Sequence, residues 1–328
     1  MAAGPAGGAP RVHTVAAGLE VPWALAFASD GRLFVTERPG RLRVISQGRL
    51  VAEPLATLEV AQSGEAGLMG LALAPDFDRS GQLYVCYTAR RPSVNRVSRL
   101  TVRERRASDE RIVLDDLPAA GIHDGCRLKF GPDGKLYVTL GDAARPADAQ
   151  RREVLAGKIL RLEPDGSVPA GNPFRDSPVW SLGHRNPQGL AWDAAGRLWA
   201  SEHGSSAHDE INLIQPGRNY GWPEVQGDAT RDGMVPPAVH SGSATWAPSG
   251  MAFLDGSLYV AGLRGRRLLK VTLRDGRVAG TASLLESAYG RLRDVAAGPD
   301  GALYVTTSNR DGRGSPARDD DRILRVVP

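Results

Sequence analysis

The sequence has almost none of the features that indicate a membrane span, a helical fold or a cysteine-bound metal. No apolar run reaches the roughly 18 residues that a membrane-spanning helix needs. Glycine and proline, with 39 and 23 residues, interrupt the chain throughout, so we expect only one short helix, over residues 147–155. The two cysteines, Cys86 and Cys126, lack the spacing of zinc ligands. We favour two buried free thiols and leave a bridge between them open.

Lysine is also scarce, although the net charge is +4. The densest basic stretch, residues 90–106, alternates arginine with strand-forming residues, whereas a nucleic-acid site would gather basic and aromatic side chains on one face. We therefore expect a solvated outer surface there and no nucleic-acid partner. The only lysines are Lys129, Lys135, Lys158 and Lys270.

One short sequence motif is present six times: a predicted strand, a tight turn ending in glycine, and a second predicted strand whose sequence is similar to Leu-Tyr-Val-Thr. Alternating apolar residues on both sides of an Asp-Gly, Ala-Gly or Ser-Gly turn predict a β-hairpin. The turn glycines lie about 45 to 62 residues apart, a period typical of propeller blades rather than of helical repeats. The copies cover residues 21–37, 67–88, 126–142, 186–204, 248–262 and 292–309.

These repeats predict an all-β fold, a six-bladed β-propeller with four-stranded antiparallel blades. Ring closure lets each blade bury both faces against its neighbours, so we expect residues 11–328 to form a single domain. Residues 1–10 are expected to be a flexible N-terminus. Residues 11–16 are expected to form a strand that pairs into the last blade and closes the ring. The expected third or fourth strands cover residues 96–102, 157–164, 266–273 and 322–327.

Polar residues gather where the innermost strands begin. Since these strands all start at one face of a propeller, the loops that enter them converge on one pocket. His123 precedes the first strand of the third hairpin, and Asp142 follows its second strand. Antiparallel pairing would bring the two side chains together, and a carboxylate can orient an imidazole as a general base. A histidine that merely caps a turn is the alternative.

Cationic side chains form a second group at the same loop ends: Arg185, Arg264, Arg291 and Arg293, with few acids beside them. Guanidinium groups gathered in one pocket repel one another, so an anionic ligand would balance their charge. The alternative is that each arginine forms a salt bridge at the rim of the pocket. Asp209 and Glu210, followed by glycine turns, suit a hard cation such as Ca²⁺.

Five longer motifs carry a family resemblance: GEAGLMGLALAPDF, HDGCRLKFGPDGKLYVTLGD, GHRNPQGLAW, SEHGSSAHDEINLIQPGRNYGWP and RLRDVAAGPDG. Together they resemble the soluble quinoprotein glucose dehydrogenase family, specifically its aldose sugar dehydrogenase branch, the glucose/sorbosone dehydrogenases. The resemblance extends over residues 12–327. It implies a propeller that binds pyrroloquinoline quinone (PQQ), a planar tricarboxylate, together with calcium.

The resemblance also implies roles for individual residues. His123 would take the proton of the sugar C1 hydroxyl while hydride passes from C1 to the quinone, and Asp142 would orient His123. Arg185 would stabilise the negative charge that develops on the cofactor. The residues that match cofactor contacts are Glu65, Arg185, Asn186, Gln188, Thr245, Arg264, Arg291 and Arg293.

Two calcium positions are implied as well. The carbonyl groups of Gly204 and Ser205 would hold the ion beside the quinone, and Glu210 with the Tyr220 carbonyl, and with Asp209, would hold a structural one. Two departures from the family pattern stand out. Cys126 lies where many members have glycine, and the loops between blades are short, so we expect an open substrate pocket and a monomer.

The implied activity is oxidation of monosaccharide and oligosaccharide aldoses at C1 to the lactone. Electrons would pass to an external acceptor, a quinone, cytochrome or dye. The family implies a periplasmic or secreted enzyme, although residues 1–11 show no signal-peptide pattern. A calcium-dependent lactonase-like hydrolase and a non-catalytic propeller that binds carbohydrate or protein are the alternatives. The arginines argue against the first, and the His123–Asp142 pair argues against the second.

Overall fold

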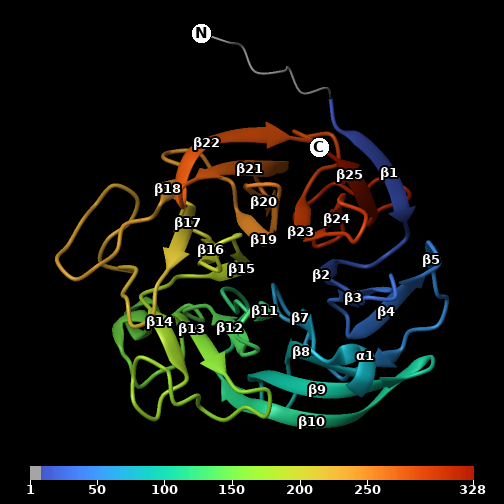
Figure 1. Ribbon diagram of the computed structural model, residues 1–328, viewed down its shortest axis with the longest axis horizontal. Helices are drawn as coiled ribbons and strands as arrows, with labels where there is room; N and C mark the ends of the chain where they lie inside the picture. Colours follow the sequence, from blue (N-terminus) through green and yellow to red (C-terminus); the bar gives the residue numbers. More distant parts are fainter. Residues whose placement is uncertain (1–8) are drawn as a thin grey trace.

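Six antiparallel sheets stand around a common axis in the computed structural model, which describes residues 9–328 (Figure 1). The prediction of an all-β, six-bladed propeller is confirmed. Most of the predicted flexible N-terminus, residues 1–8, lies outside the described residues. Within them, no helix is long and apolar enough to cross a membrane.

Each predicted hairpin forms the two innermost strands of one blade, and a third strand follows it in the sheet. The first three blades in chain order are as follows. The first consists of β2 (Pro22–Phe27), β3 (Leu33–Glu37), β4 (Arg41–Ser46), β5 (Arg49–Leu50) and β6 (Ala56–Thr57). The second consists of β7 (Leu68–Leu73), β8 (Gln82–Thr88), β9 (Asn95–Arg103) and β10 (Arg106–Leu117). The third consists of β11 (Leu128–Phe130), β12 (Leu136–Leu140), β13 (Lys158–Leu162) and β14 (Val179–Leu182).

The remaining blades repeat this plan. The fourth consists of β15 (Pro187–Trp192), β16 (Leu198–Glu202), β17 (Glu210–Ile214) and β18 (Val239–His240). The fifth consists of β19 (Pro248–Leu254), β20 (Ser257–Gly262), β21 (Arg267–Arg274) and β22 (Arg277–Leu284). The sixth consists of β23 (Leu292–Ala297), β24 (Leu303–Thr307), β25 (Ile323–Val327) and β1 (Arg11–Ala16).

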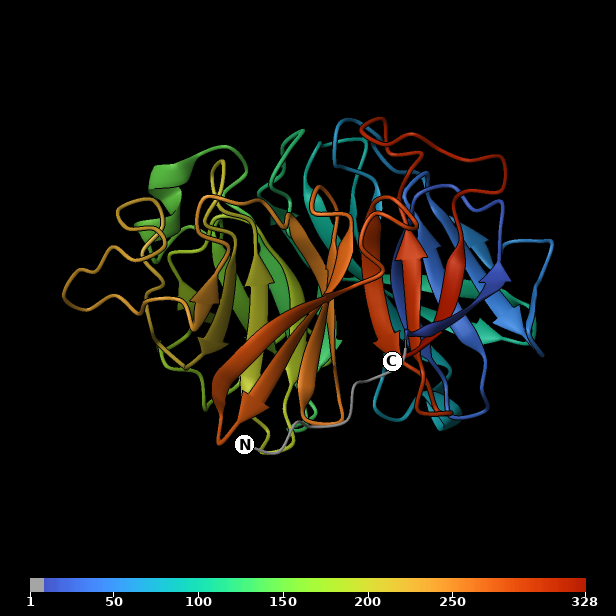
Figure 2. The same ribbon diagram turned by 90° about the horizontal axis from the view of Figure 1, so that it is seen from above.

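The first and last segments of the chain close the ring. Strand β1 pairs antiparallel with β25, with Thr14 opposite Leu324, as the sequence predicts. Leu324 is fully buried, in a cluster that also contains residues of β23 and β24. Figure 2 shows that the strands of all blades run between two opposite faces, where the connecting loops lie. The six innermost strands therefore all begin at the same face.

The predicted helix over residues 147–155 is wrong in type and length. A 3₁₀-helix covers only Pro146–Gln150 and ends at Arg151, whose backbone is extended. Ala149 is its only buried residue, so the segment has no apolar stripe that could support a longer helix. A second short helix that the sequence analysis missed, α1 (Phe77–Ser80), lies in the hairpin between β7 and β8.

The free-thiol interpretation of the cysteines is also wrong. Cys86 and Cys126 form a disulfide, with their Cα atoms 5.6 Å apart. Cys86 lies on β8, and Cys126 lies just before β11, so the bridge joins the second blade to the third. The two cysteines are 40 residues apart in the sequence, and they meet only because the second and third blades pack side by side. The sequence spacing alone could therefore not reveal the pair.

Candidate active site

A cavity of about 390 Å³ opens where the innermost strands begin. Nearly all predicted site residues line it, and they come from the second to sixth blades: from the loops that enter the innermost strands, from the starts of those strands, and from the loops after β16 and β20. The predicted residues in its wall are Glu65, His123, Arg185, Asn186, Gln188, Gly204, Ser205, Asp209, Thr245, Arg264, Arg291 and Arg293. Asp142 lies behind His123, whereas Glu210 and Tyr220 lie outside this wall.

His123 and Asp142 form the hydrogen-bonded pair that the hairpin geometry suggests. The distance from His123 Nδ1 to Asp142 Oδ1 is 2.7 Å. Asp142 is fully buried, and it also accepts hydrogen bonds from the Ala144 amide and the Trp222 indole N–H, at 2.9 Å each. An ionised carboxylate only accepts, so Nδ1 carries the hydrogen and Nε2 is the basic nitrogen of the neutral ring. The pair can therefore act as an oriented general base.

Arg185 lies beside this pair with its guanidinium carbon 5.3 Å from the centroid of the Trp222 ring. Its Nη1 donates to the His203 carbonyl oxygen at 3.4 Å, and its main-chain carbonyl accepts from the Asp142 amide. Burial lowers the pKa of Arg185, although the group stays charged at neutral pH. Trp222 thus fixes both the Asp142 carboxylate and the Arg185 guanidinium.

The expectation of few acids near the arginines is wrong. Arg291 donates from Nε to the buried Asp311 carboxylate at 2.8 Å, and Arg293 lies 3.8 Å from the same group. Glu65 is paired with Arg313 at 2.7 Å. Asp311 and Arg313 could not be predicted from the sequence, because they lie in the loop after the sixth hairpin, where no motif or spacing marks them.

Positive charge nevertheless dominates the cavity, whose wall contains five arginines and two acids. Burial opposes ionisation of Glu65, but the hydrogen bond from Arg313 and the positive charges of Arg293 and Arg313 outweigh it, so the pKa is lowered to about 2. Burial lowers the pKa of Arg293 to about 10, so this group too stays charged at neutral pH.

Three buried nitrogen atoms of residues that line this cavity have no hydrogen-bond partner among residues 9–328. They are Nε of Arg185, Nε of Arg293 and Nε2 of His203. Burial lowers the pKa of His203 to about 4, so its ring is neutral at neutral pH. Since buried polar groups in proteins are nearly always satisfied, these atoms mark positions where a bound molecule can supply hydrogen-bond partners, which at the two guanidinium nitrogens must be acceptors. Uncompensated guanidinium groups favour carboxylates or phosphates there.

Other predicted contacts already have partners that hold them in place. Asn186 Oδ1 accepts from the Gly125 amide at 3.1 Å, and Gln188 Oε1 accepts from Arg293 Nη1 at 3.0 Å. The Thr245 hydroxyl donates to the Ser206 carbonyl at 3.1 Å. Arg264 is exposed at the rim, and no ion pair involves it among the described residues.

Asp209 organises the loop that contains Gly204 and Ser205. Its Oδ1 accepts from the Gly204 amide at 2.9 Å, and its Oδ2 accepts from the amides of Trp246 and Ala247 at 2.6 and 2.9 Å. A side chain at position 204 would collide with the Ala207 carbonyl, so only glycine fits this turn. Both carboxylate oxygens face amides, which disfavours the predicted role of Asp209 beside Glu210.

Glu210 instead faces a second carboxylate. It lies opposite Glu202 in the β16–β17 ladder, and both are buried. Burial raises the pKa of each to about 8, and for Glu210 the neighbouring Glu202 adds to the effect. Asn212 donates to Glu210, while its own Oδ1 is buried without a partner among the described residues.

The site around Glu202, Glu210 and Asn212 gathers oxygen atoms of the kind that bind a hard cation. Two close carboxylates and an unpaired amide oxygen are the ligand types that a hard divalent ion prefers. The Tyr220 side chain packs nearby, stacked on His184, which is hydrogen-bonded to Glu202 at 2.8 Å. No group of three or more His, Cys, Asp or Glu side chains suited to a metal occurs in the described part of the chain. Main-chain and amide oxygens would therefore have to complete the shell.

We expect Asp209→Asn to lower the free energy of unfolding by about 1.5–3 kcal/mol, because an NH₂ group would replace an oxygen that accepts buried amide hydrogens. Chemical denaturation of both proteins measures the difference. Asp275→Asn, at an exposed turn, is the matched control and should change little. A loss of stability no larger than that of the control would contradict the bracing role of Asp209.

The comparisons with known proteins agree with one another. The family model for glucose/sorbosone dehydrogenases matches residues 19–324. Aldose sugar dehydrogenase YliI of Escherichia coli is 33% identical over 345 residues, which is 94% of this chain and 91% of the relative. Quinoprotein glucose dehydrogenase B of Acinetobacter calcoaceticus is 36% identical over 245 residues, covering 64% of this chain and 51% of the relative. The PQQ-bound aldose sugar dehydrogenase of Streptomyces coelicolor superimposes with a TM-score of 0.93 at 42% identity, covering 99% of each chain.

Proposed function

The chain belongs to the glucose/sorbosone dehydrogenase family, and from this premise we propose that it oxidises aldose sugars at C1 to the lactone with PQQ and calcium. The observation that carries the proposal is the cavity itself, where unpartnered buried guanidinium nitrogens lie next to an oriented His–Asp pair. A hydrolase that uses several metal-bound carboxylates is disfavoured, since arginines outnumber acids in the cavity wall. A pure binding module would not need a base.

The arginines account for the choice of cofactor. Arg185, Arg291 and Arg293 would hold its carboxylates and quinone oxygens, and Arg264 would contact it from the rim. Asn186, Gln188, Thr245 and Glu65 would complete the wall. When bound, PQQ supplies the two-electron acceptor for the hydride that leaves sugar C1.

The remaining chemistry belongs to the protein. Nε2 of His123 would take the proton of the C1 hydroxyl, and Asp142 would stabilise the resulting imidazolium through its 2.7 Å hydrogen bond. The Arg185 guanidinium, fixed against Trp222, would stabilise negative charge that develops during hydride transfer. Because His123 and Arg185 line one cavity, a sugar placed between them would meet both groups.

Calcium would have two roles at separate positions. The Gly204 and Ser205 carbonyls would hold the ion beside the cofactor, on a loop that Asp209 braces. Glu210 with the Tyr220 carbonyl would hold a structural ion, and we add Glu202 and the Asn212 amide oxygen to this second ligand set. The raised pKa values of the two glutamates support this assignment, since a dication would relieve their mutual repulsion.

The partners and the compartment follow from the same proposal. Substrates would be monosaccharide and oligosaccharide aldoses, and an external quinone, cytochrome or dye would accept the electrons. We propose a monomer in the periplasm or outside the cell. The disulfide supports this location, because such bridges persist in oxidising compartments.

Replacing the base should stop turnover while cofactor binding persists. His123 has a φ of 60°, so we choose His123→Asn, because asparagine tolerates this backbone conformation. We expect kcat to fall by about 10²- to 10⁴-fold in a dye-linked assay with saturating PQQ. His13→Asn, on exposed β1, is the control. More than roughly a tenth of wild-type turnover would remove His123 from this role.

Removing one buried cation should weaken cofactor binding. Arg293→Met keeps an unbranched side chain that replaces the aliphatic part of arginine but loses the charge and the donors. We expect a loss of about 1.5–3 kcal/mol in PQQ affinity, roughly 10- to 150-fold in Kd, measured by titration of the calcium-loaded apoprotein. Arg277→Met, on the exposed strand β22, should titrate like the wild type. Superimposable curves for both variants would mean that Arg293 does not contact the cofactor.

Calcium removal should separate its two roles. Treatment with a chelator should abolish activity, and recovery should require Ca²⁺ and PQQ together. Glu210→Gln should lower the melting temperature yet remain active at saturating cofactor and calcium, because the substitution affects only the structural site. Glu286→Gln, at an exposed position, controls for the loss of a surface charge. Full recovery with PQQ alone in metal-free buffer would contradict a role for calcium in the chemistry.

A further inference from the structure

The segment that contains His123 has an unusual backbone. His123, Gly125 and Cys126 have φ values of 60°, 67° and 63°, in the left-handed region. Glycine adopts this conformation freely, but histidine and cysteine do so at a cost in free energy. Residues 123–127, which we call the His123 segment, must therefore be held by their surroundings.

Hydrogen bonds hold every residue of the His123 segment. The second blade contributes Asn95, whose amide donates to Asp124 Oδ1 at 3.0 Å and whose own Oδ1 accepts from Thr88 at 2.7 Å. The remaining bonds come from the loops before the second and fourth blades and from β12. They join the His123 amide to Glu65, the Gly125 amide to Asn186, and the Cys126 and Arg127 amides to Thr139.

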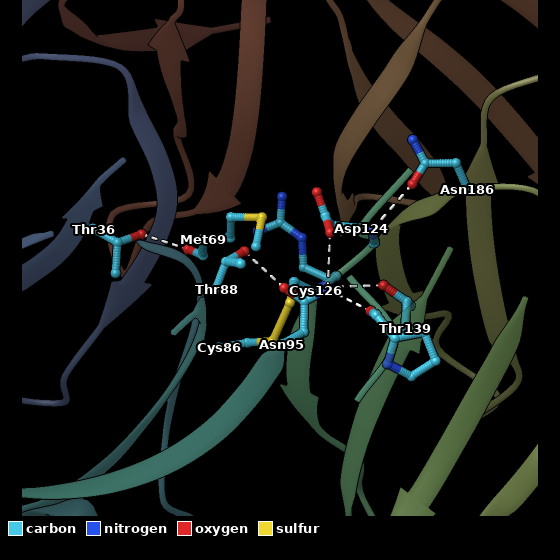
Figure 3. Close-up of a disulfide and its surroundings, with 12 residues drawn as sticks. Thr36, Met69, Cys86, Thr88, Asn95, Asp124, Cys126, Thr139 and Asn186 are labelled. Carbon is cyan, nitrogen blue, oxygen red and sulfur yellow. Dashed lines mark hydrogen bonds between the residues drawn. A yellow bond between two sulfur atoms is a disulfide. The ribbon is translucent and has the colours of Figure 1, made fainter. Parts of the chain in front are cut away.

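One covalent bond reinforces this set. The Cys86–Cys126 disulfide links β8 to a position three residues after His123, next to the Thr88–Asn95–Asp124 chain (Figure 3). Both cysteines are fully buried. The backbones of the second and third blades also approach each other closely beside the bridge, since a side chain at Gly70 would collide with the Cys126 carbonyl. The second blade therefore fixes one end of the segment from which the base projects.

Resting on the proposed function, we propose that the Cys86–Cys126 disulfide is a positioning device for the catalytic base. It holds Cys126 in its strained conformation, and through the short chain to His123 it keeps the imidazole aligned with Asp142 before the sugar arrives. Neither cysteine is among the residues that line the cavity or among the predicted cofactor contacts. Its loss should therefore lower turnover and leave the binding of sugar and cofactor unchanged.

Two double variants separate positioning from stability. Cys86→Ala with Cys126→Ala removes the bridge and keeps a strained non-glycine residue at position 126. Cys86→Ala with Cys126→Gly removes the bridge and relieves the strain, because glycine accepts a φ of 63°. We expect the glycine variant to be the more stable of the two. Alkylation of the denatured, unreduced wild type should find no free thiol, and labelling of both cysteines would refute the bridge.

Activity of the calcium- and PQQ-loaded proteins gives the first readout. Both variants should lose about tenfold or more in kcat, since small misplacements of a reacting group have effects of this size. KM for glucose and the affinity for PQQ should change less than about twofold, because neither depends on base alignment. A wild-type kcat in both variants would overturn the positioning role. So would a kcat that is low in the alanine variant and returns to the wild-type value in the more stable glycine variant, because the loss would then come from instability.

Hydrogen exchange gives a readout that does not require sugar oxidation. Amides of residues 123–127 should exchange faster in both variants than in the wild type, while those of β15 should not change. If the wild type binds PQQ but oxidises no sugar, the proposed function fails, and exchange still decides whether the bridge fixes the segment. Unchanged exchange at residues 123–127 would overturn the inference even in an active enzyme.

Discussion

The pairing of β1 with β25 closes the ring, and the geometry of the site depends on this closure. A closed ring makes six innermost strands begin at one face, so loops far apart in the sequence meet around one cavity. His123 and Arg293, for example, come from the third and sixth blades and line the same wall. An open sheet would have left these side chains apart and solvated.

Buried charge is the second organising feature. Removing an arginine from water costs several kcal/mol unless partners replace the lost hydration, and here the protein supplies only some of them. Asp311 neutralises part of the charge of Arg291 and Arg293, and Glu65 pairs with Arg313. The unpartnered nitrogens of Arg185 and Arg293 are thus prepared for an anionic ligand, which the proposed cofactor would provide. The same preorganised guanidinium groups would also stabilise the negative charge that develops during the reaction.

Local patterns predicted most of the fold and part of the site. The turn glycines revealed all six hairpins because a tight turn is encoded within a few residues, and the position of His123 and Asp142 at the two ends of one hairpin predicted their contact. Contacts between blades have no such local signal. The Cys86–Cys126 bridge, which joins two blades, therefore became visible only in three dimensions. The Glu202–Glu210 pair and the Arg291–Asp311 pair each lie within one blade, but no turn or motif in the sequence marks them. The mistaken helix over residues 147–155 shows that propensity without an apolar stripe is a weak guide.

If the cationic cavity beside the oriented His–Asp pair holds PQQ and lets it oxidise an aldose, the absorption spectrum of the bound cofactor must respond to the sugar. Apoprotein incubated with PQQ and Ca²⁺ and then freed of excess cofactor should retain PQQ, and adding glucose without an external acceptor should convert its spectrum to that of the reduced cofactor. Loss of the cofactor during separation, or a spectrum that no aldose changes, would refute PQQ-dependent aldose oxidation by this protein.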